Sequence, residues 1–261
     1  STHQLAGASA AMPPRTSRLN LRSPTQRPDY LLIYYDGFQA AADSLATWRV
    51  TNLPLDNVSP PYEVVTIPIS ALHDQFSGGR TDPSAIRNFM PAVHYRWSRR
   101  PAFVTFLGDA SPDFKNIKGL APPGQPGALL PTYENGFAIA GNLAKQFTSD
   151  DWLLNVDNPL INIPEFYGGR IPATDSRAAM DFVLKKVLFY ERHAPAGTWG
   201  NRVMLIADDD EQGPNPDPLG WAHLMQTSDL DSTHTPDHVD RAPVYLHTYP
   251  DGPGDTKPDA K

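Results

Sequence analysis

Four consecutive acidic residues are the part of the sequence best suited to hold a metal ion. Asp208, Asp209, Asp210 and Glu211 directly follow the apolar run 203–207. That run predicts a buried strand, so the carboxylates gather at its carboxyl end, the edge where α/β proteins build their sites. Such hard oxygen ligands suit Ca²⁺ or Mg²⁺. The alternatives are a solvated loop of mutually repelling carboxylates and, less favoured, a Mg²⁺-dependent phosphotransfer site using Asp208 and Asp209.

Histidines are the second set of residues that could do chemistry. His234 and His238 have the spacing with which a helix presents two metal ligands. Pro236 between them argues against a helix, and no glutamate stands between them as a general base. We therefore interpret this segment as solvated. His223 lies in an expected helix, where a surface or half-buried position is the simplest interpretation.

The glycine-containing stretch 76–89, "FSGGRTDPSAIRNF", resembles a phosphate-binding loop at first sight. A P-loop needs a Lys followed by Ser or Thr at the helix start, and Arg80 and Thr81 are poor substitutes. Thr81 or Asp82 can instead cap a helix whose first turn contains Pro83. The stretch therefore predicts a helix start rather than an anion site.

Two further pairs of aspartates come at the ends of predicted elements. Asp109 and Asp113 lie in "GDASPDF", and Asp150 and Asp151 lie in "TSDDWL". Asp side chains commonly bond to nearby backbone N–H groups in turns. We expect one Asp of each pair to cap a turn in this way.

Composition excludes several classes of protein and of mechanism. The 261 residues are 40% hydrophobic and carry a formal charge of −7, which offers no basic surface for nucleic acid. The longest apolar runs are strand-sized, so no membrane span is predicted. The chain contains no cysteine, which excludes a disulfide, a thiolate metal site and a cysteine nucleophile within it.

Strand and helix patterns alternate along the chain and would position these residues. Periodicity and β-branched content predict a mostly parallel sheet covered by helices on both faces, a three-layer α/β/α sandwich. Pro91 is expected to kink or divide its helix. The predicted strands are 29–36, 62–69, 102–109, 165–172 and 202–210, and the predicted helices are 38–50, 82–98 and 175–192. Residues 1–28 lack apolar periodicity and are expected to be flexible, without an intact secretory signal.

Several motifs, in order, resemble the gingipain family of cysteine peptidases, peptidase family C25, and most of all its sortase-type members associated with type IX secretion. The resemblance runs from about 29 to 249. Its motifs are "LHDQFSGGRTDPSAIRNFM", "VTFLGDASPDFKN", "YGGRIPATDSRAAMDFVLKKVLFYER" and "WGNRVMLIADDDEQG", followed by "AHLMQ".

This resemblance implies a fold and a division of the chain. The family's catalytic region is a caspase-like α/β/α sandwich. Residues 29–200 would form its first subdomain, and 201–261 would form the beginning of the second, catalytic subdomain, which is truncated. The helix containing His223 lies near the substrate cleft in the family, which makes His223 a substrate-cleft candidate. Structural Ca²⁺ in the family makes calcium the preferred ion for the acidic run 208–211, although no cofactor is required.

The catalytic residues of the family are missing from this chain. Gingipain-like peptidases use a His and Cys dyad, with the His in a Gly-His-Gly turn, and the sequence has neither that turn nor any cysteine. The resemblance therefore implies the non-catalytic portion of a secreted or cell-surface peptidase, inactive alone. Its partners would be a polypeptide substrate and the missing remainder of the catalytic domain. The alternative is a non-enzymatic α/β module that binds a protein partner or a divalent cation.

Overall fold

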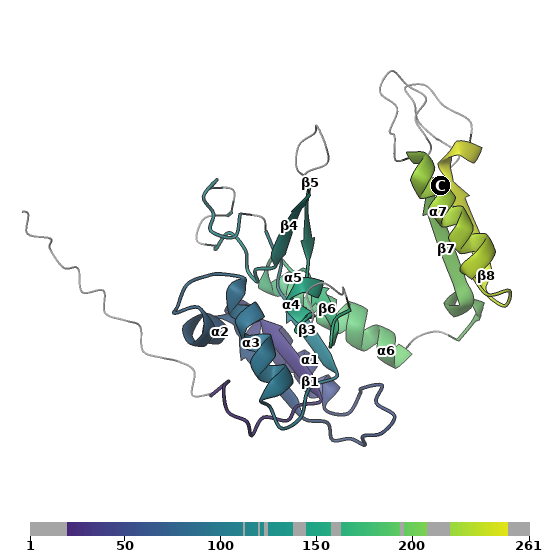
Figure 1. Ribbon diagram of the computed structural model, residues 1–261. Helices are drawn as coiled ribbons and strands as arrows, with labels where there is room; N and C mark the ends of the chain where they lie inside the picture. The colour runs from purple at the N-terminus through teal and green to yellow at the C-terminus, as the bar shows by residue number, and fades with distance from the viewer. Residues whose placement is uncertain are drawn as a thin grey trace, which may run out of the picture. The chain divides into compact units, whose positions relative to one another are not determined.

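The computed structural model describes residues 20–111, 113–119, 121–122, 125–137, 145–157, 163–193, 196–207 and 220–249. The chain divides into two compact units, Ser1–His193 and Ala194–Lys261 (Figure 1). None of the helices in the described ranges is long and apolar enough to cross a membrane.

The first unit is built on a four-stranded sheet. Its strands are β1 (Tyr30–Tyr34), β2 (Val64–Pro68), β3 (Phe103–Leu107) and β6 (Tyr167–Ile171), in the order β2-β1-β3-β6. All three neighbouring pairs are parallel and in continuous register. The strands predicted over 29–36, 62–69, 102–109 and 165–172 are confirmed, each with slightly shorter bounds.

Alternating side chains of β1 feed two separate cores. Leu31 and Ile33 enter one cluster, which is covered by α2 (Ile69–Phe76) and α3 (Ser84–Tyr95). Tyr30 and Leu32 enter the other, which is covered by helices on the opposite face. These helices are α1 (Gln39–Arg49), α5 (Ser176–Asp181) and a π-helical stretch (Phe182–Leu188). The stretch continues into α6 (Phe189–His193), which has no buried residue. The result is the predicted three-layer α/β/α arrangement, since a parallel sheet buries both faces.

Pro91 does not divide its helix, because α3 runs continuously through it. Proline has no N–H to give to the carbonyl one turn earlier, yet the apolar face of α3 stays buried along its length. Ile86, Phe89, Met90 and Val93 are all fully buried. Packing against the sheet therefore outweighs the lost hydrogen bond. Of the two predicted outcomes, the division is wrong and the kink stays a prediction.

A hairpin and a short helix interrupt the alternation between β3 and β6. Strands β4 (Tyr133–Phe137) and β5 (Lys145–Ser149) pair antiparallel, and α4 (Asp151–Leu154) follows. The hairpin projects from the body of the first unit (Figure 1). Its base rests on that body through Tyr133, whose ring stacks on Trp152 with centroids 4.2 Å apart.

Part of the N-terminal segment predicted to be flexible packs against the first unit. Leu21 is fully buried, and its carbonyl accepts a 3.0 Å hydrogen bond from Trp97 Nε1. The Arg22 guanidinium lies over the Phe76 ring at 4.3 Å. A single leucine gives no periodic signal, so the sequence could not reveal this contact.

In its described residues, 196–207 and 220–249, the second unit contains two parallel strands and an α-helix. Strands β7 (Arg202–Ala207) and β8 (Asp240–Tyr245) pair in register, and α7 (Gly220–Asp229) contacts β7. A π-helical stretch, Leu230–His234, extends α7. Short 3-10 turns occupy Asp36–Phe38, Thr198–Asn201 and Leu246–Thr248 of the chain.

Candidate functional site

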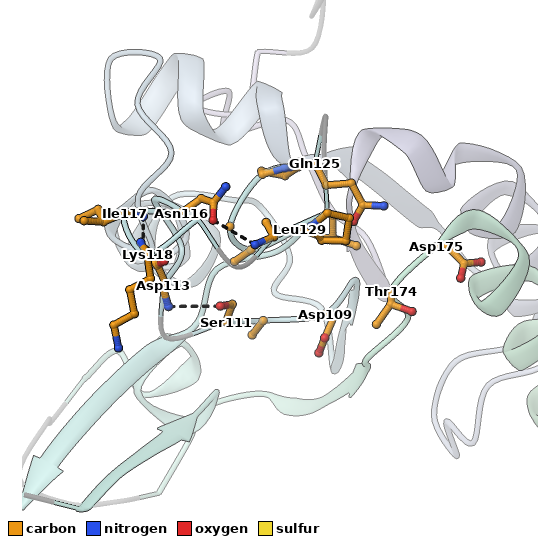
Figure 2. A pocket seen from close by; sticks show the side chains of 16 residues that line it. Asp109, Ser111, Asp113, Asn116, Ile117, Lys118, Gln125, Leu129, Thr174 and Asp175 are labelled. Atoms are coloured by element: carbon orange, nitrogen blue, oxygen red, sulfur yellow. Dashed lines mark hydrogen bonds between the residues drawn. The ribbon is translucent and has the colours of Figure 1, made fainter.

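A cavity of about 700 Å³ opens at the carboxyl ends of β3 and β6. The loop 109–129, which follows β3, supplies most of its wall, and Thr174 and Asp175, which follow β6, supply the rest (Figure 2). Polar side chains and apolar ones share the lining. This is the edge at which parallel α/β sheets hold their ligands, and the volume suits a small molecule or a few residues of a peptide.

Part of the cavity wall is a tight turn whose backbone N–H groups bind one carboxylate. The two oxygens of Asp113 accept hydrogen bonds of 2.7 Å from the backbone N–H groups of Ile117 and Lys118. Asn116 adopts a positive φ of 53°, which asparagine tolerates, and its side-chain oxygen accepts the Ala121 N–H at 3.0 Å. A Cβ at Gly127 would collide with the Asp113 backbone carbonyl, so only glycine fits there.

The two ends of the cavity loop are bonded into the sheet and to each other. The Gly108 N–H donates to the Ile171 carbonyl at 3.0 Å, and the Asp109 N–H donates to the Ala173 carbonyl at 2.9 Å. The Leu130 N–H donates to the Asp109 carbonyl at 2.9 Å. Backbone pairing between the β3 and β6 segments therefore continues beyond the strands themselves, up to the residues that begin the cavity loop.

A part-buried ion pair supports the same two loop ends. Arg170, in β6, donates two hydrogen bonds of 2.8 Å to the Asp150 carboxylate. Its remaining terminal nitrogen donates to the carbonyls of Gly108 at 2.7 Å and Leu130 at 2.9 Å. Burial alone would raise the pKa of Asp150, but hydrogen bonds and charge from Arg170, with a hydrogen bond from Thr132, lower it below its ordinary value.

Two of the three carboxylates that line the cavity bind backbone N–H groups of the protein itself. Asp113 binds backbone N–H groups, and Asp175 caps α5 by accepting the Ala178 N–H at 2.8 Å. Asp109 makes no hydrogen bond through its carboxylate to any residue that the structure describes. The described lining contains no histidine and the chain contains no cysteine, so the cavity does not hold a His and Cys dyad.

The predicted metal run and the predicted cleft histidine are in the second unit. Asp208, Asp209, Asp210 and Glu211 lie outside the described residues, so the metal site stays a prediction. His223 lies on α7 with an exposed side chain. In the ranges that the structure describes, no group of three or more His, Cys, Asp or Glu could hold a metal ion.

The glycine stretch starts a helix, as the sequence predicts. Gly78 and Gly79 have φ of 65° and 79°, and the Asp82 carboxylate accepts the Ser84 N–H at 2.8 Å where α3 begins. The positions of His234 and His238 also agree with the prediction that they do not share a helix. His234 ends a helical stretch, and Thr235 after it is extended, so His234 and His238 do not share a helix.

The prediction for the aspartate pairs is right for one pair and wrong for the other. Asp113 caps its turn, as expected. Asp150 does not cap α4 with its side chain, because its carboxylate is directed to Arg170. The Asp151 carboxylate accepts no backbone hydrogen bond from the residues that the structure describes. Arg170 was not predicted from the sequence, although an Arg that follows two glycines and precedes the buried Ile171 was a signal for a partner inside the protein.

Comparison with known proteins places this geometry in context. The sequence profile of peptidase family C25 matches residues 23–261. The crystal structure of dimeric latent PorU from Porphyromonas gingivalis matches with a TM-score of 0.54 and 21% sequence identity, over 76% of this chain and 20% of that one. A structure described as a protease matches with a TM-score of 0.41 and 18% identity, over 73% of this chain and 34% of that one. No curated protein sequence matches. The chain thus spans about a fifth of the PorU chain, whose likeness concerns the fold.

Proposed function

The chain belongs to peptidase family C25, and from this premise we propose that it is the non-catalytic portion of a gingipain-like cysteine endopeptidase. The observation that carries the proposal is a family match over residues 23–261 in a chain without a cysteine. The thiolate that attacks the scissile carbonyl must then come from other residues of the protein. The first unit serves as a scaffold, and polypeptides are the substrate class.

A peptidase assay tests this proposal. Residues 1–261 should not cleave a fluorogenic peptide library, and the protein encoded by the complete reading frame should cleave it. Treatment with iodoacetamide should abolish cleavage by the protein from the complete reading frame, because it alkylates the cysteine nucleophile. Cleavage by residues 1–261 that resists alkylation would contradict the proposal.

The second unit is the proposed place of a structural calcium ion. The run Asp208–Glu211 supplies hard oxygen ligands after β7, and the family resemblance favours Ca²⁺ over Mg²⁺. Calcium should raise the melting temperature of the chain, and replacing Asp208 and Asp209 with Asn should remove that effect. Equal stabilisation of the double variant would place the ion elsewhere. Phosphatase activity lost in Asp208→Asn would instead support the phosphotransfer hypothesis.

Secretion to the cell surface and processing of other proteins complete the proposal. Both are inferred from family membership. Fractionation of the native cells, followed by immunoblotting, tests the location. A purely non-enzymatic binding module is the less favoured alternative, and it would require the complete reading frame to lack a thiol-dependent activity.

A further inference from the structure

A hydrogen bond between the residues that flank the projecting hairpin joins its two strands at the base. Thr132 immediately precedes β4, and Asp150 immediately follows β5. The Thr132 hydroxyl donates to the Asp150 carboxylate at 2.6 Å and lies 3.2 Å from the Ser149 carbonyl. Any movement at the base of the hairpin therefore moves the Asp150 carboxylate.

Arg170 joins this base to the two ends of the cavity loop. The Nε and Nη2 atoms of its guanidinium group donate to the Asp150 carboxylate. The Nη1 atom donates to the carbonyls of Gly108 and Leu130. Gly108 immediately precedes the cavity loop 109–129, and Leu130 immediately follows it. The same side chain thus fixes the hairpin and both ends of the loop.

Burial makes this connection stiff. The Arg170 and Asp150 side chains are 12% and 22% exposed, and the guanidinium lies 5.4 Å from the centre of the Phe106 ring. Water has little access to replace a lost partner, and a buried charge that loses its partner is costly. The network is therefore stable when complete and changes as a unit when one member leaves.

We propose that Asp150 and Arg170 form a latch that couples the hairpin β4–β5 to the cavity at the carboxyl ends of β3 and β6. A partner that displaces the base of the hairpin loosens the cavity loop, and a ligand that orders the cavity loop steadies the hairpin. This coupling does not depend on the proposed peptidase function. It assigns Arg170 and Asp150 as positioning residues for the cavity.

A double-mutant cycle read by hydrogen exchange tests the latch. Tyr133→Ala removes the stack on Trp152 and so perturbs the hairpin base without touching the latch. We expect it to raise amide exchange in residues 109–130 by about tenfold in the otherwise native chain. In the Asp150→Asn background the loop should already exchange faster, and adding Tyr133→Ala should change it little further.

Controls separate the latch from general loss of stability. Asp151→Asn changes a neighbouring carboxylate that does not bind Arg170, and it should leave the loop unchanged. Amides of β1 serve as an internal reference. Additive effects of the two variants, or faster exchange in β1 to the same degree as in the loop, would overturn the proposal. If Asp150→Asn does not fold, Thr132→Val, which removes one hydrogen bond of the latch, replaces it in the same cycle.

Discussion

The two units of this chain contain parallel strands in very different surroundings. In the first unit both faces of the sheet are covered, and residues such as Leu31 and Leu32, which point to opposite faces, are both fully buried. In the second unit Leu205 on one face of β7 is 6% exposed, whereas Met204 and Ile206 on the other face are 62% and 63% exposed. The second unit, as described by itself, leaves a face of its sheet uncovered.

This difference shows that two strands with similar apolar sequences can contribute unequally to the stability of the protein. Both β1 and β7 are short apolar runs, but the hydrophobic stabilisation of a strand depends on the area that its neighbours remove from water. Parallel sheets normally have both faces covered. We therefore expect most of the unfolding free energy of the chain to come from the first unit.

The largest effect should come from truncating the fully covered strand. Leu32→Ala removes a fully buried side chain, and such changes cost about 2–5 kcal/mol of unfolding free energy. Urea denaturation of the whole chain, monitored by tryptophan fluorescence, measures the change. Leu230→Ala, at a site that is 48% exposed in the second unit, is the matched control and should have little effect. Equal losses for both variants would refute the comparison.

The next largest effect should come from the latch. Asp150→Asn leaves the Arg170 charge without its carboxylate. Breaking a buried pair costs about 3–5 kcal/mol, and partial exposure of Asp150 reduces our expectation to about 2 kcal/mol. Asp151→Asn should remain within about 0.5 kcal/mol of the native chain. A native-like urea midpoint for Asp150→Asn would show that the pair contributes nothing.

Acid should weaken the first unit in a manner that depends on two of its ion pairs, Arg170–Asp150 and Arg49–Glu191. Although burial would raise the pKa values of Asp150 and Glu191, hydrogen bonds from Arg170 and Arg49, respectively, lower both values. A lowered pKa in the folded state means that the unfolded state binds more protons. The stabilisation is therefore complete above the ordinary values of 3.8 and 4.5 and is lost as the pH falls through the lower folded values. Urea midpoints between pH 7 and pH 3 should fall less steeply for Asp150→Asn; an unchanged slope would contradict this.

The smallest change in stability should come from a substitution on the exposed face of β7 in the second unit. Ile206→Thr exchanges an exposed apolar side chain for a polar one and should change stability by less than about 0.5 kcal/mol. Leu205→Ala, next to it on the covered face, should cost more. Circular dichroism melts of the whole chain measure both. A larger loss for Ile206→Thr would mean that this face is covered in solution.

Much of the fold could be predicted from sequence because it follows from local patterns. The apolar run 30–34 and the β-branched run 64–67 have few conformations other than a strand that bury them, and the cap at Asp82 needs only neighbouring residues. The alternation of strands with helices restricts the sheet to a mostly parallel one. The absence of cysteine likewise needs no structure to exclude a thiolate nucleophile within the chain.

The cavity and its support were decided only by the tertiary structure. Arg170 meets Asp150, Gly108 and Leu130 across separations of 20, 62 and 40 residues, and none of these pairings has a local sequence signature. Leu21 and Pro91 are further cases, since one isolated leucine becomes buried and one proline is accommodated in a continuous helix. Local periodicity determines which face of an element is apolar, whereas the choice of partner for a buried charge depends on which segments the completed sheet brings together.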